Sequence, residues 1–444
     1  MSKRVAIIGG GLTGLSAAFD LHRAGIDFEL YEASARFGGN LLTSSRDGFL
    51  IEHGADSWIA QKPWLDNLAR DLGINDDVVS SANISPSTSI LKDGQLLPLP
   101  TGMLLFIPSD LQAVDASPLF SPETKRRIHD EETSPPAPLP DHEDESVASF
   151  VERHFGREMV DLVAAPLLAG VYGGDASQLS ARAVIPRLVA LERQYGSLVV
   201  GARAVSKQRP NSGLFRTMLN GMGSLIEQLV RALPASRLHL SEAIERVSYD
   251  GASFAIASIL KGRGGFSHVI CTTRIPQAAD MFAIDLPTIR YSSAATIAFA
   301  YDQTVPLPAG FGFLAAAGEK TCIRAATFVH QKWPKRVPEG KMLLRFFLSG
   351  PQLLVNDDET LIAIASAESE RLLNLRTVAR FAIVDRWPES MPQYAPGHLA
   401  TTARIRACVE SLGKIQLAGN AFDGVGMPDA VRSGRAAAAN IIAE

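Results

Sequence analysis

Residues 9–14 (GGGLTG) have the spacing of a loop that holds a pyrophosphate. They follow the apolar run 5–8, and a segment with helical apolar spacing follows them. In such a strand, turn and helix, the first glycine makes the tight turn, the second lets the backbone approach the phosphates, and the third lets the helix pack closely. The helix start binds the phosphates. We predict dinucleotide contacts from these five residues: Gly9, Gly11, Leu12, Thr13 and Gly14.

Glu32 ends a second apolar run, residues 28–31, about twenty residues after the glycine loop. A carboxylate at this offset accepts hydrogen bonds from ribose hydroxyls. The alternative is a solvated Glu after a glycine-rich turn. The order of strand, loop, helix, strand and acid favours the dinucleotide.

Residues 36–39 (RFGG) and 49–54 stand where an NAD domain would begin its next crossover helix, so this pattern indicates FAD. Gly38 and Gly39 let the chain pass close to a cofactor. Arg36 could neutralise the pyrophosphate, although a solvated surface position explains that arginine alone equally well.

The other end of the chain repeats the pattern of strand, glycine loop and helix over residues 414–442. A helix start aimed at the flavin pyrimidine would stabilise negative charge that builds there during reduction. A capped C-terminal helix is the plainer interpretation. The predicted flavin contacts here are Gly419, Val425, Gly426 and Met427.

Composition places the chain among folded multidomain proteins, because 444 residues with 46% hydrophobic and 20% charged residues can bury two or three cores. A net charge of −4 without basic stripes argues against a nucleic-acid partner. Cys271, Cys322 and Cys408 lie far apart and lack metal or redox spacing, so we predict no metal and a reducing compartment.

No targeting or membrane-spanning segment is expected. The first residues run directly into the first apolar strand, which leaves no room for a signal peptide and predicts a cytoplasmic location. The longest apolar stretch, residues 162–174, contains Pro166 and is shorter than the roughly 20 residues that a bilayer span requires.

Taken together, these segments resemble the protoporphyrinogen/coproporphyrinogen oxidase family of the flavin amine oxidase-like superfamily, nearly end to end. The run GVYGGD at 170–175 is the most diagnostic for porphyrinogen oxidases, whereas amine oxidases and phytoene desaturases share the N-terminal motifs. The other segments that carry the resemblance are 32–39, 311–314 (FGFL), 332–334 (KWP), 386–388 (RWP), 392–394 (PQY) and 419–434.

The resemblance implies an FAD-dependent oxidation of a porphyrinogen to the porphyrin in haem biosynthesis. It implies three two-electron oxidations by hydride transfer to flavin N5 and no side-chain nucleophile. Oxygen is the expected acceptor, although a membrane quinone fits the residues equally well. The resemblance also gives Gly170 a backbone carbonyl for a pyrrole, Leu314 and Phe328 as cavity lining, Val247 near the adenine and Trp387 near the flavin. Ordinary core packing is the alternative for these side chains, and Gly170 could simply end a helix.

The sequence departs from the family where other members place an Arg or a Lys for a substrate propionate. The matching position in segment 86–90 is Thr88. Lys92 and Arg182 are the substitutes that the sequence offers. The choice between protoporphyrinogen IX and coproporphyrinogen III therefore stays open.

The expected fold is α/β plus α+β in three parts. Residues 1–65, 206–275 and 405–444 are predicted to form a discontinuous Rossmann-like FAD domain, and 66–90 with 276–404 a mixed-sheet substrate domain. Residues 91–205 should form a helical, membrane-facing subdomain. The apolar patch 103–107 could dip into a lipid surface on the cytoplasmic face, although core packing explains it equally well. The Pro- and acid-rich segment 133–145 is expected to be a surface loop.

Three other functions share part of this pattern. A flavin amine oxidase would need an aromatic pair over the flavin and a Lys near N5, which the sequence does not identify. A carotenoid desaturase lacks the segments 170–175 and 387–394. A non-catalytic tetrapyrrole-binding flavoprotein would explain the missing basic anchor. A monomer and a homodimer are both compatible with the sequence.

Overall fold

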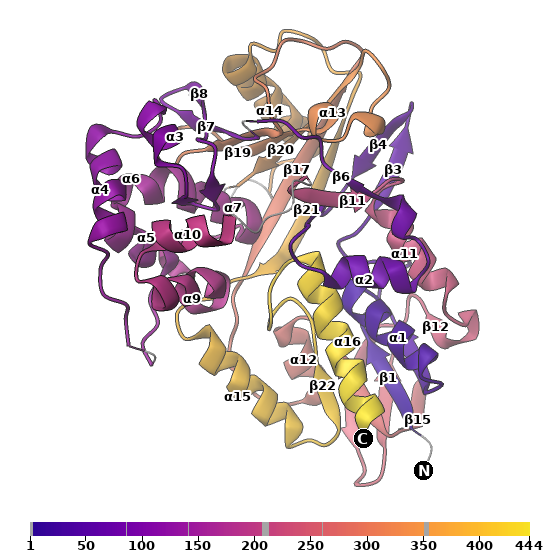
Figure 1. The fold of residues 1–444 in the computed structure, drawn as a ribbon. Helices are drawn as coiled ribbons and strands as arrows, with labels where there is room; N and C mark the ends of the chain where they lie inside the picture. The colour runs from indigo at the N-terminus through magenta and orange to yellow at the C-terminus, as the bar shows by residue number, and fades with distance from the viewer. Residues whose placement is uncertain (1–2, 86, 141, 207–212, 260, 350–354) are drawn as a thin grey trace.

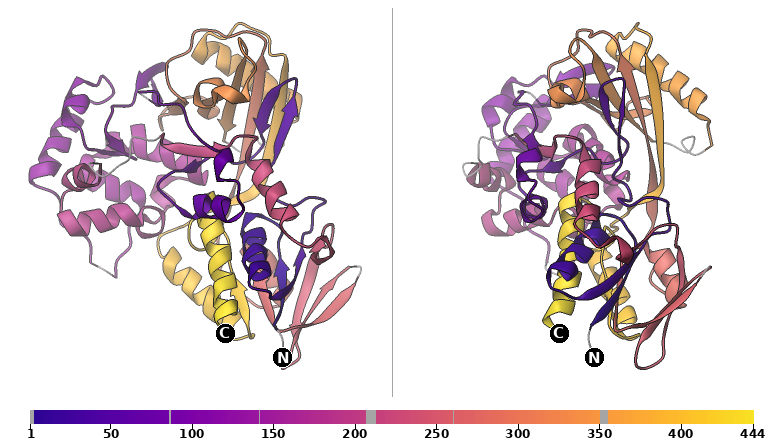
Figure 2. Two further views of the ribbon diagram at one scale, coloured as in Figure 1. Left: turned by 45° about the vertical axis from the view of Figure 1, so that its right-hand side comes forward. Right: turned by 90° about the vertical axis from the view of Figure 1, so that its right-hand side faces the viewer.

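The computed structural model describes residues 3–85, 87–140, 142–206, 213–259, 261–349 and 355–444 (Figure 1). One part holds a parallel sheet together with both ends of the chain, a second holds a larger mixed sheet, and a third is helical. Both views in Figure 2 place the helical part on the opposite side of the molecule from the ribbon of β13 (Ile244–Tyr249), β14 (Phe254–Ser258) and β15 (Gly262–Phe266).

The parallel sheet has five strands from three separated stretches of the chain, as expected for a discontinuous Rossmann-like fold. The strand order reverses between β1 and β16, and ligands of such sheets bind at the carboxyl ends of the strands at that switch point. In spatial order the strands are β12 (Leu238–His239), β2 (Asp27–Tyr31), β1 (Arg4–Ile8), β16 (His268–Cys271) and β22 (Ile415–Leu417).

Both faces of this sheet are covered, which is why its central strands are continuous apolar runs. One core contains side chains from α1 (Leu12–Arg23), α2 (Trp64–Asp71), α11 (Met222–Arg231) and α16 (Met427–Ala443). The helix α2 thus packs on the parallel sheet, whereas the sequence analysis grouped residues 66–90 with the mixed-sheet domain. The other core contains side chains from β13 (Ile244–Tyr249), β14 (Phe254–Ser258), β15 (Gly262–Phe266), α12 (Ile275–Phe282) and α15 (His398–Glu410).

The larger sheet has seven strands and is mixed, because β18 and β7 pair in parallel while its other neighbours are antiparallel. Its core includes α14 (Asp358–Leu373). The hairpin β3 (Thr43–Arg46) and β4 (Phe49–Glu52) packs on this sheet together with α13 (Val329–Lys332), and Thr43 of β3 accepts the N–H of Gly223 in α11. The strands are β21 (Phe381–Pro392), β17 (Tyr291–Tyr301), β20 (Met342–Leu348), β19 (Ile323–Phe328), β18 (Gly312–Ala315), β7 (Ser89–Lys92) and β8 (Gln95–Pro98). A small sheet of β5 (Trp58–Ile59), β11 (Phe215–Met218) and β6 (Val78–Ser80) contacts both α2, through the pair of Arg216 and Asp66, and the mixed sheet, through Phe215.

The helical part is built around its own apolar core. Its helices are α3 (Leu111–Ala116), α4 (Pro122–Thr133), α5 (Val147–Phe155), α6 (Arg157–Met159), α7 (Ala165–Tyr172), α8 (Ala181–Val184), α9 (Pro186–Tyr195) and α10 (Leu198–Ser206). Within the described ranges, no helix combines the length and apolar character that a membrane crossing requires.

The apolar patch 103–107 forms the short hairpin of β9 (Met103–Leu104) and β10 (Ile107–Pro108). Phe106 and Ile107 are buried in the helical core, whereas Leu105 at the turn is 45% exposed. Core packing therefore accounts for part of the patch and leaves one apolar side chain outside.

Candidate cofactor and substrate site

The glycine loop after β1 leaves open space in front of a helix start. Gly9 has a φ of +108°, which favours glycine, and Gly14 packs so closely that an added Cβ would stand 2.0 Å from the Gly9 carbonyl oxygen. Gly11 differs, because a Cβ there would meet no described atom within 4 Å. Leu12 and Thr13 are buried in the first turn of α1. The loop therefore has the shape that a pyrophosphate needs.

The second glycine pair lies beside this opening. Gly38 forms an isolated β-bridge with Gly11, and its N–H donates to the Gly10 carbonyl at 2.8 Å. Gly39 has a φ of +57°, and a Cβ there would contact the Gly11 Cα at 3.4 Å. Residues about 28 apart in the chain thus form one edge of the candidate site.

Glu32 and Arg36 shape the loops around the opening. One carboxylate oxygen of Glu32 accepts the N–H of Gly10 at 2.7 Å, and the other accepts the Ser34 N–H at 2.8 Å. The Arg36 guanidinium donates to the main-chain carbonyls of Phe37, Gly39 and Leu41. In the structure the guanidinium of Arg36 therefore binds carbonyls of its own loop. The sequence analysis predicted that this side chain contacts the pyrophosphate.

The loop between β22 and α16 meets the first glycine loop at the same edge of the sheet. Thr272, which follows β16, lies close to both loops. A Cβ added at Gly9 would meet the Thr272 hydroxyl, and a Cβ added at Gly419 would meet the Thr272 carbonyl oxygen. Gly426 caps α16, and Met427 begins it. The helix also touches α1 directly, because a Cβ at Gly434 would stand 2.1 Å from the Thr13 carbonyl oxygen.

These two helix starts and the Glu32 carboxylate suit the parts of FAD, since N–H groups at helix starts favour phosphate and developing negative charge. Val247 is buried in β13 and packs with Ala6, Ile8 and Tyr31 on the far face of the sheet. Trp387 in β21 donates its indole N–H to the His53 carbonyl at 3.0 Å.

The residues predicted to contact substrate gather around α7 only in part. A Cβ at Gly170 would lie 3.9 Å from Leu314 in β18, and Leu314 and Val425 both pack against the helical core. Phe328 is instead buried in the core of the seven-stranded sheet. Thr88 directly precedes β7, whose Ser89 is paired with Phe313 of β18. Gly170, Leu314 and Val425 thus bring together α7, the mixed sheet and the loop before α16.

The two basic substitutes for a propionate anchor already have protein partners. Lys92 pairs with Glu158 at 3.2 Å and donates to the Leu119 carbonyl, while Arg182 donates to the Glu143 carbonyl. Lys62, which the sequence analysis did not single out, pairs with the buried Asp429 in the first turn of α16 at 2.5 Å. Asp429 could have been singled out from the sequence, because acidic residues are favoured in the first turn of a helix.

Gln393 and Tyr394, here called the neutral junction, connect all three parts of the molecule. The Gln393 side-chain amide donates to the Tyr172 carbonyl at 2.7 Å and to the Ser292 hydroxyl at 2.9 Å. The Tyr394 hydroxyl donates to the Asn420 carbonyl and accepts the Gly424 N–H at 2.9 Å. The segment 392–394 carried the family resemblance, but its contacts with residues 172 and 420–424 could not be predicted from spacing.

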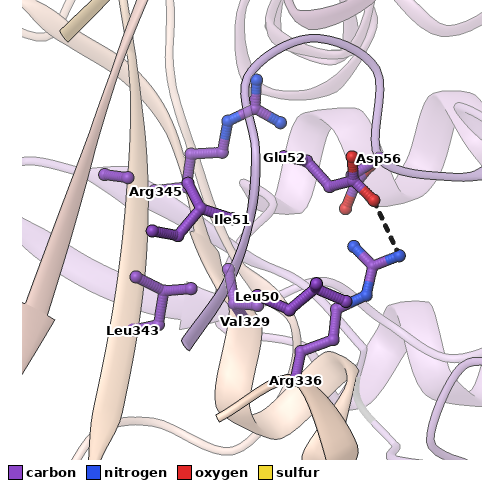
Figure 3. Close-up of a pocket in the computed structure, with 9 residues that line it drawn as sticks. Leu50, Ile51, Glu52, Asp56, Val329, Arg336, Leu343 and Arg345 are labelled. Atoms are coloured by element: carbon purple, nitrogen blue, oxygen red, sulfur yellow. Dashed lines mark ion pairs between the residues drawn. The ribbon is translucent and has the colours of Figure 1, made fainter. Parts of the chain in front are cut away.

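A second cluster, here called the charged seam, lies where β4 and the following loop meet the mixed sheet (Figure 3). Arg336 pairs with Glu52 at 2.9 Å, and Lys332 pairs with Asp56 at 3.0 Å. Arg345 donates to the His53 carbonyl at 3.0 Å, while its Nε is buried without a described partner. The seam consists of Glu52, Asp56, Lys332, Arg336 and Arg345.

For each of the two carboxylates in the seam, burial raises the pKa and the neighbouring positive charges lower it. Burial raises the pKa of Glu52, and the Arg336 charge only partly offsets this effect. For Asp56 burial acts in the same direction, but the charges of Lys332 and Arg345 prevail and hold its pKa well below the ordinary value. Asp56 is therefore ionised, and the seam keeps its cations only because the carboxylates face them.

The comparisons with known proteins agree in family and in fold. Residues 12–442 match the family described as flavin containing amine oxidoreductase. The chain is 30% identical to the coproporphyrinogen III oxidase of Staphylococcus aureus, with 100% of each chain covered. It is also 30% identical to the Bacillus subtilis enzyme of that name, over 99% of this chain and 98% of the relative.

A solved structure extends the likeness to three dimensions. A crystal structure from Exiguobacterium sp. 255-15, named provisionally as a protoporphyrinogen oxidase, is 31% identical with a TM-score of 0.89. The alignment covers 100% of this chain and 99% of that chain. The fold of this chain is therefore that of a solved relative from end to end.

Proposed function

The chain belongs to the family of flavin-containing amine oxidoreductases and is an FAD-dependent oxidase of porphyrinogens, and we propose that its substrate is coproporphyrinogen III. The observation that carries the choice is the full-length match to two relatives with that name. The run 170–175, which spans the end of α7 and the turn after it, favours a porphyrinogen oxidase without choosing between the two porphyrinogens.

We propose that the predicted cofactor residues hold FAD at the switch point of the parallel sheet. The open space at Gly11 and the neighbouring starts of α1 and α16 support this assignment. The proposed contacts are Gly9, Gly11, Leu12, Thr13, Gly14, Glu32, Arg36, Gly38, Gly39, Val247, Trp387, Gly419, Val425, Gly426 and Met427.

The proposed substrate slot lies between α7 and the mixed sheet, with Thr88, Gly170 and Leu314 as its lining, whereas Phe328 is buried in the core of the sheet. The 3.9 Å approach between the Gly170 position and Leu314 supports a slot of this kind. An apolar slot excludes water and lets a few polar groups orient a flexible tetrapyrrole. The Gly170 carbonyl is the proposed acceptor for a pyrrole N–H.

When bound, FAD accepts a hydride from a methylene bridge of the substrate. The chain's own contribution is to hold that bridge carbon in place, to keep water out and to supply helix starts that favour negative charge. We propose that the parallel-sheet part binds FAD, that the mixed sheet covers the substrate, and that the helical part completes the slot. The helix α2 is assigned to the FAD-binding part, because Leu65 and Leu68 are buried in the core beside the parallel sheet.

Two finer features remain part of the proposal. Oxygen is the proposed acceptor, with hydrogen peroxide as its product. The proposed place of contact with a lipid surface on the cytoplasmic side is the helical part, where Leu105, Tyr195 and Val200 are exposed on adjoining elements.

The test is anaerobic mixing of the FAD-loaded protein with coproporphyrinogen III and, separately, with protoporphyrinogen IX. We expect coproporphyrinogen III to bleach the flavin at least tenfold faster, and oxygen to restore the flavin colour with release of peroxide and a fluorescent porphyrin. Faster bleaching by protoporphyrinogen IX would contradict the substrate. Flavin that an amine reduces and neither porphyrinogen reduces would contradict the function.

A further inference from the structure

The contacts of Gln393 suggest more than packing, because the side chain joins the end of α7 to β17. Its amide donates to the Tyr172 carbonyl, and Ser292 in β17 donates to the same carbonyl at 3.0 Å. Gly174 lies so close that an added Cβ would stand 1.9 Å from the Gln393 side-chain oxygen. The glycine-rich end of α7 thus fits around one amide side chain.

Tyr394 makes the matching contacts on the cofactor side. Its hydroxyl lies between the Asn420 carbonyl and the Gly424 N–H, in the loop that leads into α16. Burial raises the pKa of Tyr394, so the hydroxyl stays protonated and can donate. Its ring meets Tyr172 edge-on at 5.6 Å and stacks on His398 at 3.9 Å.

One pair of consecutive residues therefore contacts both segments that must meet at the flavin. Gln393 holds the carbonyl that ends α7, and Tyr394 holds two main-chain groups of the loop before α16. Both contacts are made mostly to main-chain atoms, which fixes backbone position and not merely side-chain packing. Tyr394 is 1% exposed, so water offers no substitute for these bonds.

We propose that Gln393 and Tyr394 are positioning residues that set the distance between the substrate helix α7 and the cofactor loop 418–426. The inference rests on the proposed function for the roles of these two segments. Gln393 fixes the substrate side, Tyr394 fixes the cofactor side, and the peptide bond between them couples the two.

The first variant is Tyr394→Phe, which keeps the ring contacts and removes the two hydrogen bonds to the loop. We expect FAD to bind about tenfold more weakly, the reduction potential of the bound flavin to shift, and kcat to fall about tenfold with KM little changed. FAD affinity is measured by flavin fluorescence, and the potential by reductive titration without substrate.

The second variant is Gln393→Glu, which places an acceptor against the Tyr172 carbonyl. We expect KM to rise about tenfold while the affinity for FAD and the flavin potential stay at the wild-type values. The control is Tyr301→Phe, which removes a buried hydroxyl in the seven-stranded sheet and should change neither set of values.

Wild-type FAD affinity and potential in Tyr394→Phe would overturn the proposal, as would equal losses in Tyr301→Phe. If Tyr394→Phe cannot be obtained folded, Ser292→Ala tests the substrate side, and an unchanged KM in that variant would count against the proposal. A wild-type protein that oxidises no porphyrinogen would refute the proposed function, but it would leave the comparison of FAD affinity and potential intact.

Discussion

The charged seam and the neutral junction both join the parts of the molecule, but they do so with different chemistry. In the seam, acidic and basic side chains pair in a buried region, as in the pair of Arg336 and Glu52. In the junction, an amide and a phenol bond mainly to main-chain groups, as in the contact of Gln393 with the Tyr172 carbonyl. A buried ion that loses its partner costs several kcal/mol, whereas a lost neutral hydrogen bond costs about 1 kcal/mol.

This difference indicates a division of tasks. The seam holds the hairpin β3–β4 and the following loop against the mixed sheet in one arrangement, because any other arrangement would leave a buried charge without its partner. The junction can set a distance accurately at a smaller energetic cost, which suits the place where substrate helix and cofactor loop meet. The predictions below test this contrast, from the largest expected effect to the smallest.

Arg336→Met should give the largest loss, because it leaves Glu52 buried without its cation. We expect the free energy of unfolding to fall by about 3–5 kcal/mol at pH 8, measured by denaturant titration. The raised pKa of Glu52 makes the loss smaller at lower pH, since protonation removes the uncompensated charge.

The control for that variant is Arg380→Met, at an arginine that pairs with Asp47 and Asp302 on the surface. A loss below about 1 kcal/mol is expected there. Equal losses in the two variants would remove the contrast between buried and exposed charge on which the comparison depends.

Gly174→Ala should give an intermediate loss, because the new methyl group would overlap the Gln393 side-chain oxygen. We expect about 1–3 kcal/mol less stability by thermal unfolding, together with a higher KM for the porphyrinogen. Gly318→Ala is the matched control, since a Cβ there meets no described atom within 4 Å and should change stability by less than about 0.5 kcal/mol. If both substitutions behave alike, the junction is not as tightly packed as its contacts indicate.

The smallest effect concerns His398, which stacks on Tyr394 beside the junction. Burial lowers the pKa of His398 to about 4, below its ordinary value of 6.5. A base with a lowered folded pKa contributes stability that is present above pH 6.5 and is lost as the pH falls toward 4. Between pH 7 and pH 5 we expect about 1–2 kcal/mol of this loss.

The measurement compares His398→Gln with the wild type by denaturant unfolding at both pH values. The variant should lose less stability than the wild type on acidification, because Gln does not titrate. An identical loss in the two proteins would show that other groups carry the pH dependence.

The geometry of the first glycine loop could be predicted from the sequence because its signals are local. The loop 9–14 makes its tight turn at Gly9 and its close contact at Gly14 within six residues, so spacing alone defined the geometry. The mixed sheet was predicted from the family resemblance, not from residue periodicity, and the order of its strands was not predicted.

The contacts across the three parts could not be predicted, because they join residues far apart in the chain. Gln393 and Tyr172 are 221 positions apart, and Lys332 and Asp56 are 276 positions apart. Each of these residues alone looks like an ordinary polar side chain, and only the fold shows its partner. The same reason explains why α2 was grouped with the substrate domain, since its amphipathic pattern does not say which sheet it covers.

The direct contact between Gly434 in α16 and Thr13 in α1 also has a consequence for biosynthesis. The parallel sheet needs β1 near residue 4, β16 near residue 270 and β22 near residue 415 before its order is complete. A ribosome delivers these segments in sequence, so the first glycine loop waits for nearly the whole chain before its partner helix arrives. The nascent protein should therefore acquire its cofactor after translation, and until then the apolar face of α1 lacks the helix that packs against it.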